Sequence, residues 1–284
     1  MEIILLVAVI VLMTVQSMAK KAFTIKFPDT NAFFYTCLSC VVAAVFFALT
    51  AEDKLVFSAE LIPYAAGFAI SSGSSMFFSI LALKYGSMAL TSLVVSYSLI
   101  IPALFGIIMY KEPVSPALII GIVLLCISLA LIKSKEEDKV QVTFKWIVCA
   151  FLSFLGNGFC SSVQQIQQKT FDGGYKSEFM IMSLAIVVVI TLALSLIYER
   201  KHISVILKKG ILTPIINGAA NGGVNLFVMY LVLLMPSSVL FPVVSAGGIV
   251  MTAVVSMTIY KERLSKKQIA SMVLGIFAIV FLNL

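Results

Sequence analysis

The chain has 284 residues, of which 61% are hydrophobic and only 12% are charged, and its mean hydropathy is +1.11. Soluble domains of this size carry about twice that charged fraction, so the composition excludes them and predicts a membrane protein. The net charge of +7 does not indicate a nucleic-acid partner. The basic residues lie in short loops between apolar segments, where membrane topology explains them.

Ten apolar segments follow one another along the chain, each near the length that crosses about 30 Å of hydrocarbon. They span residues 2–19, 30–50, 60–83, 87–109, 115–133, 146–167, 178–198, 211–234, 237–259 and 266–284. The linkers between them, such as 199–209, are short and polar, and the longest charged linker, 133–145, lies near the middle. The sequence therefore predicts an all-α polytopic membrane protein with ten transmembrane helices.

The two halves of the chain resemble each other. The tripeptide Tyr-Lys-Glu closes the fourth segment at Glu112 and the ninth segment at Glu262. At nearly the same offset, Gln16 aligns with Gln164. We therefore expect two five-helix repeats, residues 1–135 and residues 140–284.

An odd number of spans in each repeat inserts the second repeat upside down relative to the first. Most Lys and Arg residues lie in the loops that follow the odd-numbered segments. The positive-inside rule puts those loops in the cytoplasm. The charges thus predict a multi-pass protein of the cell membrane with both termini outside the cytoplasm.

Two hexapeptides carry a family resemblance: Tyr110-Lys111-Glu112-Pro113-Val114-Ser115 and Tyr260-Lys261-Glu262-Arg263-Leu264-Ser265. They are similar to the Gly-Glu-Arg-Leu-Ser/Thr element that the EamA-type ten-helix branch of the drug/metabolite transporter superfamily repeats once per half. The chain departs from it by Lys in place of Gly before each Glu, and by Pro113-Val114 in place of Arg-Leu. The resemblance implies transport of small metabolites, often export, through a central cavity. It also implies cytoplasmic termini, and on that point we follow the charges.

Three asparagines, Asn217, Asn221 and Asn225, recur every fourth residue and stack along one helix face. An amide that faces lipid has no partner, so this face must meet protein or a polar cavity. Amides also join membrane helices to one another, but three in register favour a cavity wall. The counterpart face in the first repeat carries Ser71 and Ser75, whose small side chains also suit close helix packing.

Gln16 and Gln164 are candidates for the opposite side of the same site. Amides donate and accept hydrogen bonds, so they bind carboxylate, amine or hydroxyl groups without a buried charge. The alternative for glutamines near a helix end is a place in the headgroup layer. Tyr97 fits either stacking on a substrate or packing in the core.

Two prolines and two glutamates are candidate gating or structural residues. Pro102 and Pro242 lie inside spans, where proline permits bending of a gate or makes a plain kink. Glu112 and Glu262 suit proton sites or gates. We expect instead that each lies in the first turn of the following helix, where the macrodipole favours a carboxylate.

The predicted spans hold no Asp or Glu at depth, and the five Cys and one His form no metal-ligand set. We therefore expect no catalytic residue, no metal and no cofactor. The leading hypothesis is an alternating-access transporter of a small neutral or zwitterionic metabolite, working as an exporter or exchanger. The alternatives are a flippase for lipid-linked headgroups, and a non-transport intramembrane enzyme or scaffold. The expected partners are the substrate and the lipid bilayer, without nucleic acid; a homodimer stays open.

Overall fold

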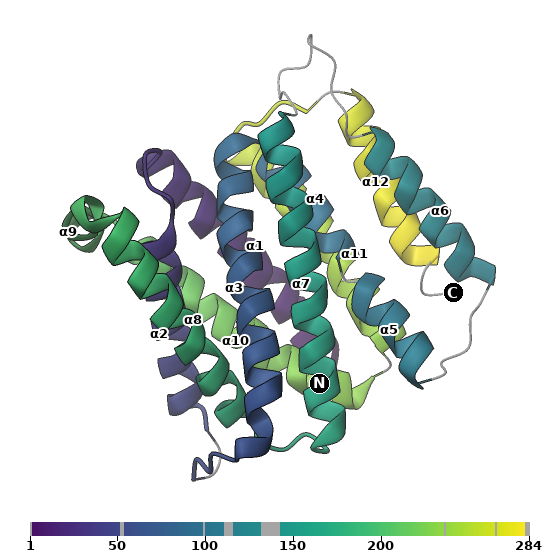
Figure 1. The fold of residues 1–284 in the computed structure, drawn as a ribbon. Helices are drawn as coiled ribbons and strands as arrows, with labels where there is room; N and C mark the ends of the chain where they lie inside the picture. Colours follow the sequence, from purple (N-terminus) through teal and green to yellow (C-terminus); the bar gives the residue numbers. More distant parts are fainter. Residues whose placement is uncertain are drawn as a thin grey trace.

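The computed structural model describes residues 2–51, 54–98, 100–110, 116–131, 143–235, 237–264 and 266–281. The first half of the chain forms α1 (Glu2–Lys26), α2 (Phe33–Leu49), η1 (Ala59–Leu61), α3 (Ile62–Tyr85), α4 (Met88–Tyr97), α5 (Ile100–Tyr110) and α6 (Pro116–Leu131). The second half forms α7 (Phe144–Thr170), α8 (Lys176–Tyr198), α9 (Arg200–Lys209), α10 (Leu212–Leu234), α11 (Ser237–Thr258) and α12 (Lys266–Phe281). Every regular element of the described chain is helical, so the predicted all-α fold is confirmed (Figure 1).

Among the described residues, 6 helical stretches are long and apolar enough to cross a membrane. They are α1, α3 with η1, Met88–Gly106, α7, α8 and α10. Shorter apolar stretches lie in α2, α11 and α12. Many large apolar side chains point away from the bundle, among them Ile3 and Ile197. A helix that is apolar on its outer side as well as its inner side is typical of a membrane span.

The helices follow the ten predicted segments closely, with one unpredicted helix. Residues 199–209, expected as a polar linker, form α9. Ile206 is fully buried and, with Ile203, belongs to an apolar cluster that also contains Phe23 of α1 and Phe27 directly after it, while Lys208 and Lys209 are exposed. The basic residues made this segment resemble a linker, although its apolar residues recur on one side with the period of a helix.

The fourth predicted segment contains α4 and α5, with Ser98 in a turn directly after α4. The hydroxyl oxygen of Ser98 accepts a 2.7 Å hydrogen bond from Asn157 Nδ2. Pro102 follows in the first turn of α5, where a missing N–H removes no helical hydrogen bond. In the second half α11 runs from Ser237 to Thr258 without interruption across Pro242.

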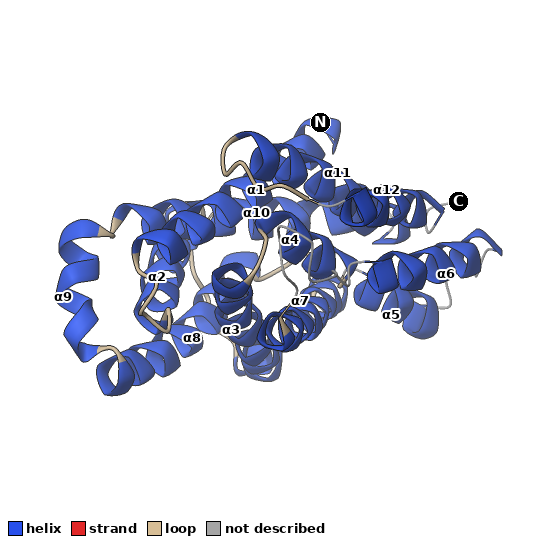
Figure 2. Ribbon diagram, turned by 90° about the horizontal axis from the view of Figure 1, so that it is seen from above, coloured by secondary structure: helices blue, strands red, loops and turns tan. Residues whose placement is uncertain are grey.

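The closest helix pairs each take one helix from either half of the chain. These pairs are α3 with α7, α1 with α10, α2 with α8, and α6 with α12. Figures 1 and 2 show α6 and α12 together at one edge of the molecule, α2, α8 and α9 at the other, and the remaining long helices between them. The fold therefore gathers helices of both halves around its centre.

Candidate functional site

A polar cavity lies among the central helices, with about 160 Å³ open to the centres of water molecules. Helices α1, α3, α4, α7, α10 and α11 supply most of its wall, and α8 supplies one residue. The charged and polar lining residues are Gln16, Ser17, Lys20, Ser72, Ser75, Ser79, Thr91, Ser92, Ser96, Asn157, Ser161, Gln164, Asn221, Asn225 and Thr252. None of the described lining residues is acidic. The cavity thus offers many hydrogen-bonding groups from both halves of the chain.

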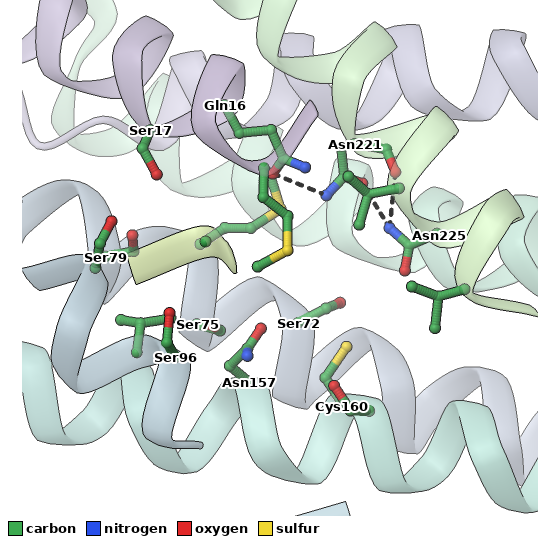
Figure 3. Close-up of a pocket in the computed structure, with 18 of the residues that line it drawn as sticks. Gln16, Ser17, Ser72, Ser75, Ser79, Ser96, Asn157, Cys160, Asn221 and Asn225 are labelled. Atoms are coloured by element: carbon green, nitrogen blue, oxygen red, sulfur yellow. Dashed lines mark hydrogen bonds between the residues drawn. The ribbon is translucent and has the colours of Figure 1, made fainter. Parts of the chain in front are cut away.

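Four amides form a hydrogen-bonded chain along one side of the cavity. Gln164 Nε2 donates to the backbone oxygen of Asn225 at 3.2 Å and to its Oδ1 at 3.4 Å. Asn225 Nδ2 donates to Asn221 Oδ1 at 3.2 Å, and Asn221 Nδ2 donates to Gln16 Oε1 at 3.5 Å (Figure 3). The sequence analysis singled out these four amides together with Asn217, but it placed Gln16 and Gln164 on the side of the site opposite the asparagines. That placement is wrong, because the fold brings the four into direct contact from α7, α10 and α1.

Serine hydroxyls line the side of the cavity that faces this amide chain (Figure 3). Ser75 lines the cavity as predicted, and its hydroxyl also donates to the backbone oxygen of Ser153 on α7 at 3.2 Å. Ser71 does not line the described cavity wall; its neighbour Ser72 does. The backbone of Ser71 instead packs on Gly156, where an added Cβ would lie 2.7 Å from Ser71 O. Of the two readings of this face, close packing holds for Ser71.

Residues 1–134 match the model of the EamA-like transporter family. This part of the chain is similar to EamA-like transporters. With the apolar helices, this match confirms the predicted resemblance to the drug/metabolite transporter superfamily and identifies a multi-pass membrane protein. One solved crystal structure covers 98% of this chain and 94% of its own length, with a TM-score of 0.66. At 11% identity it shows a shared fold and nothing about activity. No curated protein matches the chain.

Two other predicted site residues lie outside the cavity wall. Tyr97 is buried, and its hydroxyl forms a 2.5 Å hydrogen bond with Ser128 Oγ on α6. The Ser128 hydroxyl in turn donates to Ser271 O on α12 at 2.6 Å. Tyr97 therefore anchors the outer pair α6 and α12, which is the core-packing alternative. Asn217 is fully buried, and neither of its amide atoms has a hydrogen-bond partner in the described chain.

Glu262 is a helix cap, but for a helix other than the one predicted. It precedes α12, which begins at Lys266, and its carboxylate turns to the start of α4. There it accepts a 2.6 Å hydrogen bond from Ser87 Oγ and a 3.0 Å hydrogen bond from Met88 N. The predicted interaction with a helix dipole is right in kind and wrong in partner, because the loop folds back onto the first half. Its counterpart Glu112 lies outside the described residues.

Lys21 completes this cluster at the end of the bundle. Its ammonium lies 3.3 Å from Glu262 Oε1 and donates to Leu83 O at 3.2 Å and Gly86 O at 3.0 Å. Burial alone raises the pKa of Glu262, but the hydrogen bonds from Met88, Ser256 and Ser87 and the Lys21 charge outweigh it and lower that pKa. Glu262 is therefore a structural carboxylate that stays ionised at neutral pH.

Sequence reasoning missed one charged residue of the cavity, Lys20. The first apolar segment was expected to end at residue 19, which puts Lys20 in a loop, whereas α1 continues to Lys26. The available signal was helical spacing: Lys20 follows Gln16 by four residues and so shares its helix face.

Proposed function

We propose that the protein moves a small neutral or zwitterionic metabolite across the cell membrane by alternating access. The cavity carries this proposal, since its amide chain joins Gln16 of the first half to Gln164, Asn221 and Asn225 of the second. In a lipid environment such amides are costly unless they pair with protein, water or a ligand. A membrane protein of a transporter family that keeps them around an internal cavity has the parts of a solute-binding site.

The chemistry of the wall supports a hydrogen-bonded substrate. Each amide presents donors and acceptors, and the serines and threonines of α3, α4 and α11 add hydroxyls that do both. Such a wall binds the hydroxyl, amine and carboxyl groups of a small metabolite. It does not require a catalytic residue, and we expect no enzymatic activity.

The arrangement of the helices supports movement of two halves against each other. Residues 1–135 and 140–284 are taken as inverted repeats, and the closest helix pairs join one half to the other. Lys21 and Glu262 bridge the halves at the end of the bundle where α3 ends and α4 begins. Basic residues concentrate at that end, including those of α9, so we assign it to the cytoplasm and both termini to the outside.

Counterflow in proteoliposomes tests the proposal. Vesicles loaded with unlabelled metabolites, screened as mixtures, are expected to accumulate labelled metabolite only when they contain the protein. The double variant Asn221→Leu/Gln164→Leu is expected to lose most of this flux, because it removes the middle and one end of the amide chain. Asn31→Leu, which replaces an exposed asparagine in the loop between α1 and α2, is the matched control.

Equal flux in the double variant and the control would place the binding site elsewhere. Thermal unfolding of both variants in detergent separates lost binding from lost folding. No flux of any metabolite through wild-type protein would remove the transport proposal itself.

A further inference from the structure

Lys20 is the one charged residue in the cavity wall as far as the structure describes it. It lies on α1, inside a 25-residue apolar helix, one turn beyond Gln16 on the same face. An ammonium inside a membrane-spanning helix is costly unless a counter-ion, water or ligand stabilises it. Such residues in membrane proteins therefore commonly mark the path or the site of a solute.

The described part of the chain gives Lys20 no counter-ion. Among the described residues, no carboxylate forms a salt bridge with its Nζ, no acceptor forms a hydrogen bond with it, and no residue of the cavity wall is Asp or Glu. The carboxylate of Glu262 lies on the adjacent lysine, Lys21, and on the start of α4. The positive charge of Lys20 is thus left to the contents of the cavity.

The surroundings of Lys20 supply further donors. Gln16 accepts from Asn221 through Oε1, which leaves its NH₂ group to donate. Asn217, one turn before Asn221 on α10, is buried and has no hydrogen-bond partner in the described chain, but it lies outside the cavity wall and supplies no donor there.

We propose that Lys20 is the anion-binding residue of the cavity, so that the transported metabolite carries a carboxylate or a phosphate. An ammonium beside amide N–H groups matches the oxygens of such an anion, and charge-assisted hydrogen bonds are stronger than neutral ones. The inference rests on the proposed transport function, but it changes the proposed substrate class: it keeps zwitterions, leaves out neutral metabolites and adds anions. The amide chain then binds the uncharged remainder of the molecule.

The first test needs no substrate, because Cys160 also lines the cavity and serves as a probe of its potential. A single-cysteine protein is made by replacing the other four cysteines with Ala: Cys37, Cys40, Cys126 and Cys149. The modification rates of Cys160 by an anionic sulfonate and by a cationic trimethylammonium methanethiosulfonate are compared. Their ratio cancels the intrinsic reactivity of the thiol. The ratio of the anionic to the cationic rate is expected to fall roughly ten-fold in Lys20→Met, since removal of a nearby cation slows the anionic reagent and speeds the cationic one.

Two controls keep this test specific. Lys20→Arg keeps the cation and is expected to keep the ratio. Lys208→Met removes an exposed lysine of α9 and is expected to leave the ratio unchanged. An unchanged ratio in Lys20→Met would overturn the proposal, whether or not a transported metabolite has been found.

The second test uses ligands and tells the two anions apart. Thermal stabilisation of purified protein is measured with small carboxylic acids, their primary amides and phosphate monoesters, beginning with lactate, lactamide and glycerol 3-phosphate. We expect acids or phosphates, and not the amides, to stabilise wild type and Lys208→Met, with the apparent Kd rising about ten-fold or more in Lys20→Met. Stabilisation by amides equal to that by acids would overturn the proposal. Counterflow of neutral solutes alone would do so while leaving the transport function intact.

Discussion

Replacing Glu262 by Gln is expected to destabilise the protein, because this carboxylate holds together groups from three places in the chain. It accepts from Ser87 Oγ at 2.6 Å and from Met88 N at 3.0 Å, and it lies 3.3 Å from Lys21 Nζ. Gln keeps the shape but loses the charge. Hydrogen bonds to a charged group contribute about 1.5–3 kcal/mol, and a carboxylate at a helix N-terminus about 0.3–2 kcal/mol. Since the amide retains part of both, we expect a loss of about 2–3 kcal/mol.

The pH dependence of this loss has a definite sign. The pKa of Glu262 is lowered in the folded protein, so its stabilising effect is complete above the ordinary carboxyl pKa, which is about 4.3. That effect is lost as the pH falls through the lowered, folded-state value. The difference in stability between wild type and Glu262→Gln should therefore be constant near neutral pH and shrink in acid.

Thermal unfolding in detergent, followed by tryptophan fluorescence and circular dichroism, measures the difference. Glu60→Gln, which neutralises an exposed carboxylate in η1 just before α3, is the matched control. Lys21→Met should lower the unfolding midpoint in wild type more than in Glu262→Gln, since the pair is already broken there. Equal unfolding midpoints for Glu262→Gln and Glu60→Gln would refute this prediction. So would a Lys21→Met effect on the midpoint that is the same in wild type and in Glu262→Gln.

Two further substitutions separate packing from binding. Gly156→Ala should lower the unfolding midpoint, with a cost of about 1–3 kcal/mol, because the added Cβ would lie 2.7 Å from Ser71 O. Gly67→Ala is the control and should have little effect, since its Cβ would meet Val163 at an ordinary 3.6 Å. Equal midpoints for the two variants would contradict this prediction. Tyr97→Phe should cost about 1 kcal/mol by removing the bond to Ser128, with counterflow unchanged. Reduced metabolite affinity in Tyr97→Phe would instead indicate that Tyr97 contributes to substrate binding.

Hydropathy predicted most of the fold because the bilayer imposes a length and an apolar surface on each spanning helix. The bilayer also made the amides informative: lipid offers no partner to Asn221 or Gln164, so a polar cavity lined by both could be anticipated. Their place on the same side of it could not, because that depends on how α7 packs against α10. Ser71 could not be separated from its neighbours in this way, since small residues suit packing and cavities equally. The part of the cavity residues in substrate binding stays a prediction.

The partners of charged residues were less predictable. A lysine near the end of a span belongs equally well to a loop, to the headgroup layer or to an interior surface, and only the course of α1 distinguishes these for Lys20. Glu262 lies beside α12 in the sequence, which made that helix the natural expectation. Its contact with α4 depends on how the two halves fold onto each other, and no local pattern encodes that.

The cap on α4 also bears on how the protein is made. Met88 and Glu262 are 174 residues apart, so α4 emerges from the ribosome long before the residue that completes its first turn. Until then, Lys21 also lacks its carboxylate, and α1, α2, α3 and α6 lack their closest neighbours, which all belong to the second half. The newly made first half is therefore a set of inserted helices that finishes folding only after α12 has been synthesised. Fragments ending near residue 134, expressed alone, should be degraded, and co-expression of the second half should rescue them.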